Sequence, residues 1–296
     1  MTEGVICNLC PRLCGALRTP TKGDGVCHCG TVPIVARAAA HFGEEPCISG
    51  VRGSGTVFFS GCSLRCVFCQ NSKISRFPFG KSIEETNLRD IFERLEQLGV
   101  HNINLVSPSH FASSISRALE KPLSIPVIWN SSGYDNVETL RSLEGKIQIF
   151  LPDMKYSDNA LALCLSGAGD YFECAKKAIA EMFRQTGRYR LDSDGILCSG
   201  LVVRHLALPS HMRNTRGVID WFSSTFHDGD AMFSLMTQYT PLGDLRAFPE
   251  IDRPLSRREC ALLERCLFNS GISDGFIQER CSAGCELIPD FDLTGV

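Results

Sequence analysis

The stretch Gly61–Asn71, with the sequence GCSLRCVFCQN, decides how this chain of 296 residues is interpreted. Its cysteines Cys62, Cys66 and Cys69 have the spacing C-x3-C-x2-C and follow the apolar run 56–59. Three thiolates on one short loop can ligate three irons of a cubane iron–sulfur cluster, because thiolate is the ligand that these clusters use. The fourth iron then stays open to a chelating cofactor. A zinc ion is the weaker interpretation, since structural zinc sites normally close with a fourth protein ligand.

The same stretch resembles the signature of the radical S-adenosylmethionine enzymes, in which an aromatic residue, here Phe68, precedes the last cysteine. The trailing Gln70-Asn71 and the Gly-rich turn 49–55 narrow the resemblance to sequences similar to the pyruvate formate-lyase activating enzyme, in an uncharacterised PflX-type branch. The resemblance implies that S-adenosylmethionine chelates the open iron of a [4Fe-4S] cluster and is cleaved to methionine and a 5'-deoxyadenosyl radical. It also implies an electron donor such as flavodoxin or ferredoxin, and a glycyl radical enzyme as protein substrate.

Composition limits the other functional classes. The net charge of -3, with both signs interspersed, gives no electrostatic case for a nucleic acid or an anionic membrane as partner. We find no apolar run of membrane-spanning length and no secretory signal pattern, so we expect a cytoplasmic enzyme. In a protein of this size, the sixteen cysteines indicate metal ligation together with ordinary buried thiols rather than a disulfide framework.

A second cysteine group lies in residues 1–30, in the segments CNLCPRLCG and GVCHCG. Its spacing C-x2-C-x3-C-x12-C, among Gly and Pro residues, is typical of a metal-binding loop. An auxiliary iron–sulfur cluster and a structural zinc ion both fit this spacing, which does not choose between them; a metal-free segment is the third interpretation. The preferred ligands are Cys7, Cys10, Cys14 and Cys27, with His28 or Cys29 in reserve.

Beyond the cluster loop, short apolar runs alternate with helical patterns, which predicts an α/β fold with a parallel sheet. The resemblance implies a partial (β/α)6 TIM-like barrel of the radical S-adenosylmethionine type. We expect a Cys-rich metal-binding segment over 1–48, the barrel core over 49–250, and a C-terminal helix and tail over 251–296 that pack on the barrel. The predicted strands are 56–59, 102–106, 125–129, 147–151, 201–208 and 233–236, with an edge strand over 34–41.

Polar residues that directly follow the apolar strands are candidates for cofactor binding, because catalytic groups of such barrels lie at the C-terminal strand ends. The guanidinium of Arg204 lies inside a strand, where it is costly unless paired, and a bidentate bond to the methionine carboxylate would pair it. Asp153 can accept hydrogen bonds from a ribose or orient Lys155. The resemblance implies the remaining contacts, with His110 equally explained as a helix-start residue. The candidate cofactor-binding residues are Phe68, His110, Asn130, Ser132, Asp153, Lys155, Arg204 and Tyr239.

Two classes of function remain open at this point. The first is a radical enzyme that acts on a glycyl radical enzyme, another protein, a peptide or a small metabolite. The second is a non-catalytic iron–sulfur or zinc protein that transfers electrons or binds a partner. The pair Cys281 and Cys285 is too small to form a metal site alone. We expect the other cysteines, Cys47, Cys164, Cys174, Cys198, Cys260 and Cys266, to be structural residues of the core.

Overall fold

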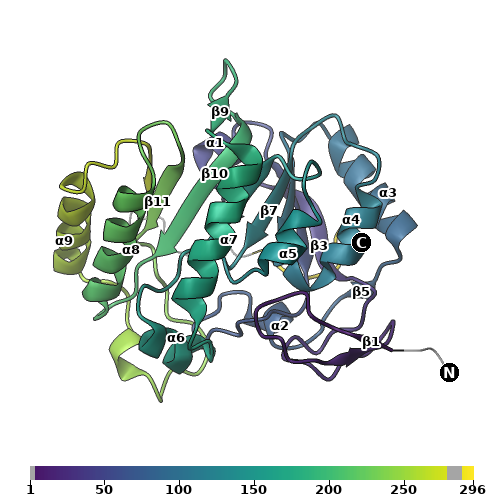
Figure 1. The fold of residues 1–296 in the computed structure, drawn as a ribbon, viewed down its shortest axis with the longest axis horizontal. Coiled ribbons are helices and arrows are strands. Elements are labelled where there is room, and N and C mark those ends of the chain that lie inside the picture. Colours follow the sequence, from purple (N-terminus) through teal and green to yellow (C-terminus); the bar gives the residue numbers. More distant parts are fainter. Residues whose placement is uncertain (1–3, 279–288) are drawn as a thin grey trace.

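The computed structural model describes residues 4–278 and 289–296. Over these residues, a ten-stranded sheet has the order β12-β11-β10-β8-β7-β6-β4-β3-β5, with β9 paired to β10 (Figure 1). Its parallel part is β4 (Ser54–Phe59), β6 (Ile103–Val106), β7 (Val127–Ser131), β8 (Ile149–Pro152), β10 (Leu197–Leu206), β11 (Met232–Met236) and β12 (Gly275–Gln278). The strands β3 (Ile34–His41), β5 (Lys81–Ser82) and β9 (Arg190–Leu191) pair antiparallel.

Helices connect the parallel strands, as parallel pairing requires. On one face of the sheet, α3 packs on α4, α5 on α7, and α8 on α9. These helices are α3 (Glu85–Gln97), α4 (Ala112–Ala118), α5 (Val137–Arg141), α7 (Tyr171–Thr186), α8 (Met212–Thr225) and α9 (Arg257–Phe268). Further elements are α1 (Pro46–Ser49), α2 (Ser72–Ser75), α6 (Asn159–Ser166) and the hairpin of β1 (Val5–Ile6) with β2 (Leu17–Arg18).

The other, inner face of the sheet is filled at one end by α1. Side chains alternate between the two faces along each strand, so Trp129 and Phe150 belong to the core under the helices. Their neighbours in sequence face the opposite way and pack against Cys47 and Ile48 of α1. These inner-face residues are Ile128, Ile149, Leu151, Val202 and Met232. In Figure 1, α1 lies at the end of the sheet opposite to α2 and α6. The far end of the inner face is therefore left for polar side chains.

The predicted α/β class with its parallel sheet is confirmed, and the six predicted parallel strands are present. The structure adds β12 beside β11, which the sequence analysis did not predict. The edge strand 34–41 is confirmed as β3. The helix α3 begins at Glu85, since Glu84 has the extended backbone of an N-cap, with ψ 159°.

The cysteines expected in the core differ in their burial. Cys47 and Cys260 are buried, as predicted. Cys164 is exposed, because α6 turns it to solvent, and this prediction was wrong. The others, Cys174, Cys198 and Cys266, are only half-buried. The pair Cys281 and Cys285 lies outside the described residues.

The C-terminal tail lies along β3. Leu293 N donates to Ala36 O at 3.1 Å, and Ala38 N donates to Thr294 O at 2.9 Å. Phe291 packs edge-on against Phe58, with ring centroids 5.5 Å apart. The tail therefore packs on the sheet beside the strand that leads into the cysteine loop. Among the described helices, none has the length and apolar character needed to cross a membrane.

Replacing Ile48 by alanine tests the role of α1. Ile48 is fully buried against the inner face of the sheet, so Ile48→Ala should lower the free energy of unfolding by about 2–5 kcal/mol. Val51 lies three residues further on and is 91% exposed, so Val51→Ala should leave stability unchanged. Urea denaturation followed by circular dichroism measures both. Equal midpoints for the two variants would contradict the packing described for α1.

Candidate functional site

The loop after β4 brings its three cysteines, Cys62, Cys66 and Cys69, into a cavity of about 250 Å³. The backbone enters this loop through Gly61, whose φ of 85° lies in the left-handed region. A Cβ at Gly61 would stand 2.5 Å from Cys29 Sγ, well inside van der Waals contact. Glycine therefore meets both the backbone and the steric requirement at this position.

An arginine from the N-terminal segment forms hydrogen bonds with the backbone of the cysteine loop. Arg12 Nε donates to Ser63 O at 2.7 Å, and its Nη2 donates to Ser166 O at 2.7 Å and to Leu64 O at 3.3 Å. The guanidinium thereby ties the backbone of the cysteine loop to the C-terminal end of α6. Sequence reasoning missed Arg12, because its partners are backbone carbonyls far away in the sequence.

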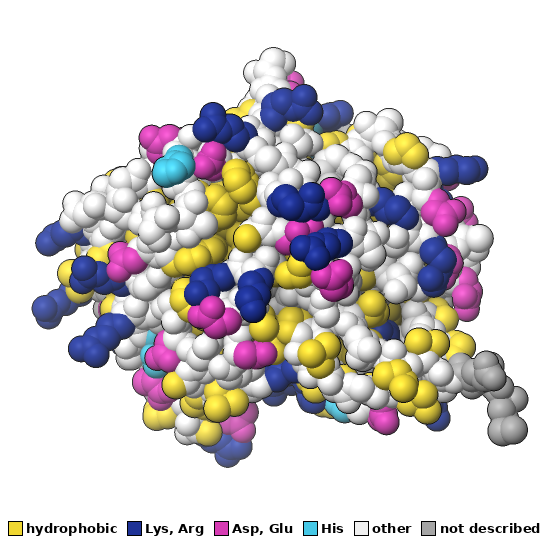
Figure 2. Space-filling view, viewed as in Figure 1, with side chains coloured by type: hydrophobic (Ala, Val, Ile, Leu, Met, Phe, Trp, Pro, Cys, Tyr) yellow, Lys and Arg dark blue, Asp and Glu magenta, His cyan; other side chains and the backbone are white. Residues whose placement is uncertain are grey.

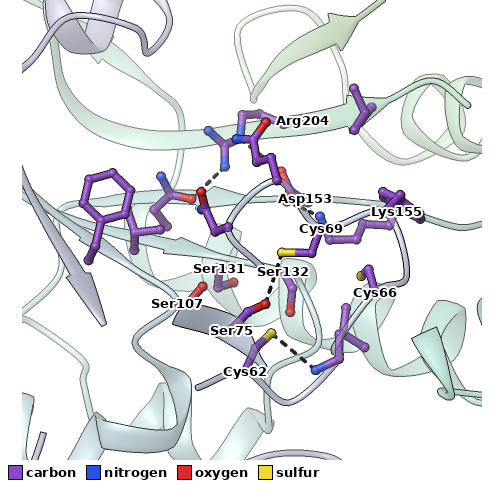
Figure 3. A pocket seen from close by; sticks show the side chains of 18 of the residues that line it. Cys62, Cys66, Cys69, Ser75, Ser107, Ser131, Ser132, Asp153, Lys155 and Arg204 are labelled. Carbon is purple, nitrogen blue, oxygen red and sulfur yellow. Dashed lines mark hydrogen bonds and ion pairs between the residues drawn. The ribbon is translucent and has the colours of Figure 1, made fainter. Parts of the chain in front are cut away.

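Each of the three sulfur atoms accepts a hydrogen bond. Leu64 N donates to Cys62 Sγ at 3.4 Å and Ser75 Oγ to Cys69 Sγ at 3.3 Å, as Figure 3 shows. Cys66 Sγ accepts from Ser166 Oγ at 2.9 Å. Hydrogen bonds to the sulfurs are one means by which a protein tunes an iron–sulfur cluster, so these partners suit thiolates that ligate iron.

In the part of the protein that the structure describes, no three His, Cys, Asp or Glu side chains form a group that could hold one metal ion. Burial, together with the neighbouring thiols of Cys66 and Cys62, raises the pKa of Cys69 to about 11. A bound cation is then what keeps such thiols deprotonated.

Charged side chains from several strand ends meet beside the cysteines. Arg204 of β10 donates to Asp153 Oδ1 at 3.1 Å, to Glu44 Oε2 at 2.9 Å and to Asn130 Oδ1 at 2.6 Å. Lys155 Nζ lies 2.5 Å from Asp153 Oδ2 and is drawn next to the cysteines in Figure 3. The guanidinium that the sequence analysis expected to be paired by a cofactor is therefore already paired by two carboxylates of the protein itself.

The ion pairs among Arg204, Lys155 and Asp153 keep these buried side chains ionised. Burial alone would lower the pKa of Arg204, but Asp153 and Glu44 raise it above its ordinary value. Burial likewise opposes the charge of Lys155, whose pKa is raised by Asp153 and by the Cys66 thiolate. Burial would raise the pKa of Asp153, but Lys155 and Arg204 lower it. The cavity thus holds a fixed ammonium beside the thiols and a fixed guanidinium–carboxylate pair deeper inside.

The candidate cofactor-binding residues line this cavity, with one exception. His110 is buried beneath the loop instead, with Nε2 2.7 Å from Ser60 O and its ring against Phe111. The hydroxyl of Tyr239 donates to Ile251 O at 2.9 Å, so this residue offers its ring to the cavity rather than its polar end. The predicted residues that line the cavity are Phe68, Asn130, Ser132, Asp153, Lys155, Arg204 and Tyr239.

Sequence reasoning also missed Glu44. Its Oε1 accepts from Asn104 Nδ2 at 3.0 Å and from Asn130 Nδ2 at 3.3 Å, while its Oε2 bonds Arg204. Glu44 precedes α1, on a connection that enters the inner side of the sheet. No local pattern distinguishes such an acid from one on a solvated loop, since its partners are on three distant strands.

Residues 49–160 match the family model described as a 4Fe-4S single cluster domain. The uncharacterized protein MJ0674 of Methanocaldococcus jannaschii is 30% identical over 229 residues, which are 74% of this chain and 62% of that protein. The chain therefore spans less than two thirds of the length of this relative. SuiB of Streptococcus suis, solved bound to precursor peptide SuiA, aligns with TM-score 0.50 and 14% identity over 77% of this chain and 48% of its own. A mutant of spore photoproduct lyase aligns with TM-score 0.50 and 12% identity over 74% of each chain.

The protein has the fold of the radical S-adenosylmethionine superfamily. The match to the 4Fe-4S domain includes β4, the cysteine loop and the strand ends of β6, β7 and β8. The match to the 4Fe-4S single cluster domain supports a [4Fe-4S] cluster in this protein.

Gly61→Ala should prevent cluster assembly while leaving the protein folded. The new Cβ meets Cys29 Sγ, and the left-handed backbone adds about 1–2 kcal/mol of strain. Gly99 has φ 78° and open space around it, so Gly99→Ala has the backbone strain without the clash. We expect a large loss of iron per protein molecule for Gly61→Ala alone, measured after anaerobic reconstitution. Equal iron content in both variants would contradict the geometry of the loop.

Removal of the buried guanidinium should destabilise the whole fold. Arg204→Met leaves Asp153 and Glu44 without their cation, and breaking a buried ion pair in this way costs about 3–5 kcal/mol. Arg246, which pairs with Asp244 at the surface, is the matched control, and Arg246→Met should leave the urea midpoint unchanged. If Arg204→Met unfolds with the same urea midpoint as the wild-type protein, the ion pairs of Arg204 do not hold the strands together.

Proposed function

We propose that this protein is a radical S-adenosylmethionine enzyme that takes a hydrogen atom from a polypeptide substrate. One observation supports this proposal most strongly. Three thiols, each of which accepts a hydrogen bond, line one cavity. Ionised side chains from the ends of β8 and β10 and from the β3–α1 connection line the same cavity. The resemblance of the cysteine loop to radical S-adenosylmethionine enzymes supports the same conclusion.

In this proposal, Cys62, Cys66 and Cys69 hold three irons of the [4Fe-4S] cluster. When bound, the cluster supplies the electron that splits S-adenosylmethionine into methionine and a 5'-deoxyadenosyl radical, which becomes 5'-deoxyadenosine by taking one hydrogen atom from the substrate. Lys155 offsets the negative charge of the thiolates, because its ammonium is fixed beside them by Asp153.

The remaining residues bind and orient the cofactor. Glu44 places a carboxylate at the wall of the cavity, which matches the ammonium group of a methionine moiety, and its ion pair with Arg204 holds this carboxylate in place. The rings of Phe68 and Tyr239, 6.1 Å apart, offer apolar surface for an adenine. Asn130, with its amide between Glu44 and Arg204, fixes the orientation of both charged groups.

We infer the polypeptide substrate from two sources. The resemblance to the pyruvate formate-lyase activating enzyme favours a glycine in a partner enzyme as the hydrogen donor, with flavodoxin or ferredoxin as the source of electrons. SuiB, which is similar in fold, was solved with a precursor peptide bound. Both point to a carbon–hydrogen bond of a polypeptide, in its backbone or in a side chain, rather than to one of a small metabolite.

Anaerobic turnover tests this function. The reconstituted protein, given dithionite and S-adenosylmethionine, should release 5'-deoxyadenosine, whereas a Cys62→Ala/Cys66→Ala/Cys69→Ala variant should give only the background amount. Cys164→Ala, on the exposed face of α6, serves as control and should retain wild-type release. With a glycine-containing polypeptide deuterated at Cα, we expect deuterium in the 5'-deoxyadenosine.

Two outcomes would contradict the proposal at different levels. An intact cluster that releases no 5'-deoxyadenosine would favour an electron-transfer or binding protein. Release without transfer of deuterium from any polypeptide tested, together with transfer from a deuterated small metabolite, would retain the radical chemistry and reject the polypeptide substrate.

A further inference from the structure

A buried acid, Glu45, lies on the inner side of the sheet, next to Glu44 in sequence. The residue is 0% exposed, and its Oε2 has no hydrogen-bond partner. Its Oε1 accepts from Gln278 Nε2 at 3.5 Å, which is the limit of a hydrogen bond. A buried carboxylate is costly unless a cation or several donors compensate it. Glu45 is therefore short of a partner.

The buried guanidinium on this face of the sheet is already used by other groups. Arg204 donates to Glu44, Asp153 and Asn130. Among the residues that the structure describes, no cation forms an ion pair with Glu45. Burial raises the pKa of Glu45, and Arg204 opposes this rise without cancelling it. The described part of the protein thus leaves one carboxyl on this face without a counterion.

Two further oxygen atoms beside Glu45 lack a partner. Ser234 of β11 is 0% exposed and close enough to lower the pKa of Glu45, but its Oγ is not placed for a hydrogen bond. The Oε1 of Gln238 is also buried without a partner, while its Nε2 donates to Gln278. We call these four side chains, Glu45, Ser234, Gln238 and Gln278, the inner wall. Since buried polar atoms normally have hydrogen bonds, the inner wall has the character of a site for a ligand that donates them.

The inner wall is reached from the cavity that the cysteines line. Gln278, Leu206 and Met236 line this cavity. Leu206 and Met236 are paired in register, and two residues earlier on the same strands Arg204 is paired with Ser234. Side chains two residues apart point to the same face of a sheet, so the polar pair lies about 7 Å deeper than the apolar pair. A ligand entering the cavity meets apolar side chains first and the unpartnered oxygen atoms after them.

We propose that the inner wall binds a cationic side chain, lysine or arginine, of the polypeptide substrate, with the cation on Glu45. This inference rests on the proposed function, which supplies the polypeptide. Such side chains carry a charged tip on an apolar stem, which matches Leu206 and Met236 followed by Glu45 and Ser234. The cation displaces the distant amide of Gln278 and gives Glu45 a charge-assisted hydrogen bond.

The balance of charge favours a cation over an anion or a neutral group. Among the described Asp, Glu, Lys and Arg side chains at this cavity and its inner wall, three acids face two bases: Glu44, Glu45 and Asp153 against Arg204 and Lys155. One positive charge on the ligand balances this set, whereas an anion adds to the excess of acids. A neutral amide is already present in Gln278 and makes only the long contact at 3.5 Å.

Binding of capped tripeptides tests the proposal without any turnover. The probes are acetyl-Gly-Lys-Gly-amide, acetyl-Gly-Arg-Gly-amide and the uncharged acetyl-Gly-norleucine-Gly-amide. They are titrated by calorimetry into the anaerobically reconstituted protein with S-adenosylmethionine and no reductant. The wild-type protein should bind a cationic peptide about tenfold more tightly than the norleucine peptide. The tighter of the two cationic peptides identifies lysine or arginine as the preferred side chain.

Glu45→Gln retains the shape of the side chain and removes its charge, so this variant should lose the preference for cationic peptides. Glu120→Gln, at an exposed position, is the matched control and should retain it. Equal affinities of the wild-type protein for charged and uncharged peptides would overturn the proposal, as expected if water alone fills the inner wall. A preference that survives Glu45→Gln would overturn it as well.

A second pair of variants keeps the test decisive if Glu45→Gln does not fold. Gln278→Lys places an ammonium of the protein itself beside Glu45, so it should abolish the preference for cationic peptides. Gln278→Met removes the amide without adding a charge and should retain the preference. A preference that is equal in these two variants would contradict the assignment of the cation to Glu45.

Turnover separates this proposal from the proposed function. With dithionite and peptides deuterated at the glycine Cα, the 5'-deoxyadenosine should contain more deuterium from the cationic peptide than from the norleucine peptide. Selective binding of the cationic peptides without release of 5'-deoxyadenosine would retain the inner wall as a binding site and reject the radical reaction. Deuterium transfer that does not depend on the charge of the peptide would retain the reaction and reject the inner wall.

Discussion

The structure depends on the burial of three thiols and several charges at one end of an otherwise apolar sheet. Burial of ionised groups is costly unless each has a partner, and here each one has. Arg204 is held between Asp153 and Glu44, and Lys155 rests on Asp153. The thiols have hydrogen-bond donors of their own. Together these contacts make a polar site that keeps its shape without a ligand, which is what an enzyme needs to place a reactive cofactor.

The two ends of the inner face of the sheet differ in character: one is packed with apolar side chains and the other carries the polar site. At the N-terminal end of the strands, α1 packs Cys47 and Ile48 against aliphatic residues and closes the core. The connection that leads into α1 also sends Glu44 towards Asn104, Asn130 and Arg204. One short segment before β4 therefore both seals the apolar part and completes the polar part. Charged side chains of the outer surface, by contrast, are interspersed in sign on the face seen in Figure 2.

The sequence alone was enough for the features that depend on local pattern. The alternation of apolar runs predicted the parallel strands, and the position of polar residues at strand ends predicted part of the cavity lining, including Asp153 and Lys155. The sequence was not enough for side chains whose hydrogen-bond partners lie far away in the chain. Glu44 and Arg12 bond groups on other elements, and nothing next to them in sequence indicates this. His110 was misplaced for the same reason, since its carbonyl partner at Ser60 lies fifty residues earlier.

The central claim is that the loop of Cys62, Cys66 and Cys69 holds a cluster with one iron open to S-adenosylmethionine. Electron–nuclear double resonance of the reduced wild-type protein tests it most directly, with S-adenosylmethionine labelled with 15N at the amino group and 17O at the carboxylate. The account predicts hyperfine coupling of both labels to the cluster, and none in the variant that lacks the three cysteines. An intact cluster in the wild-type protein that couples to neither label would contradict the account.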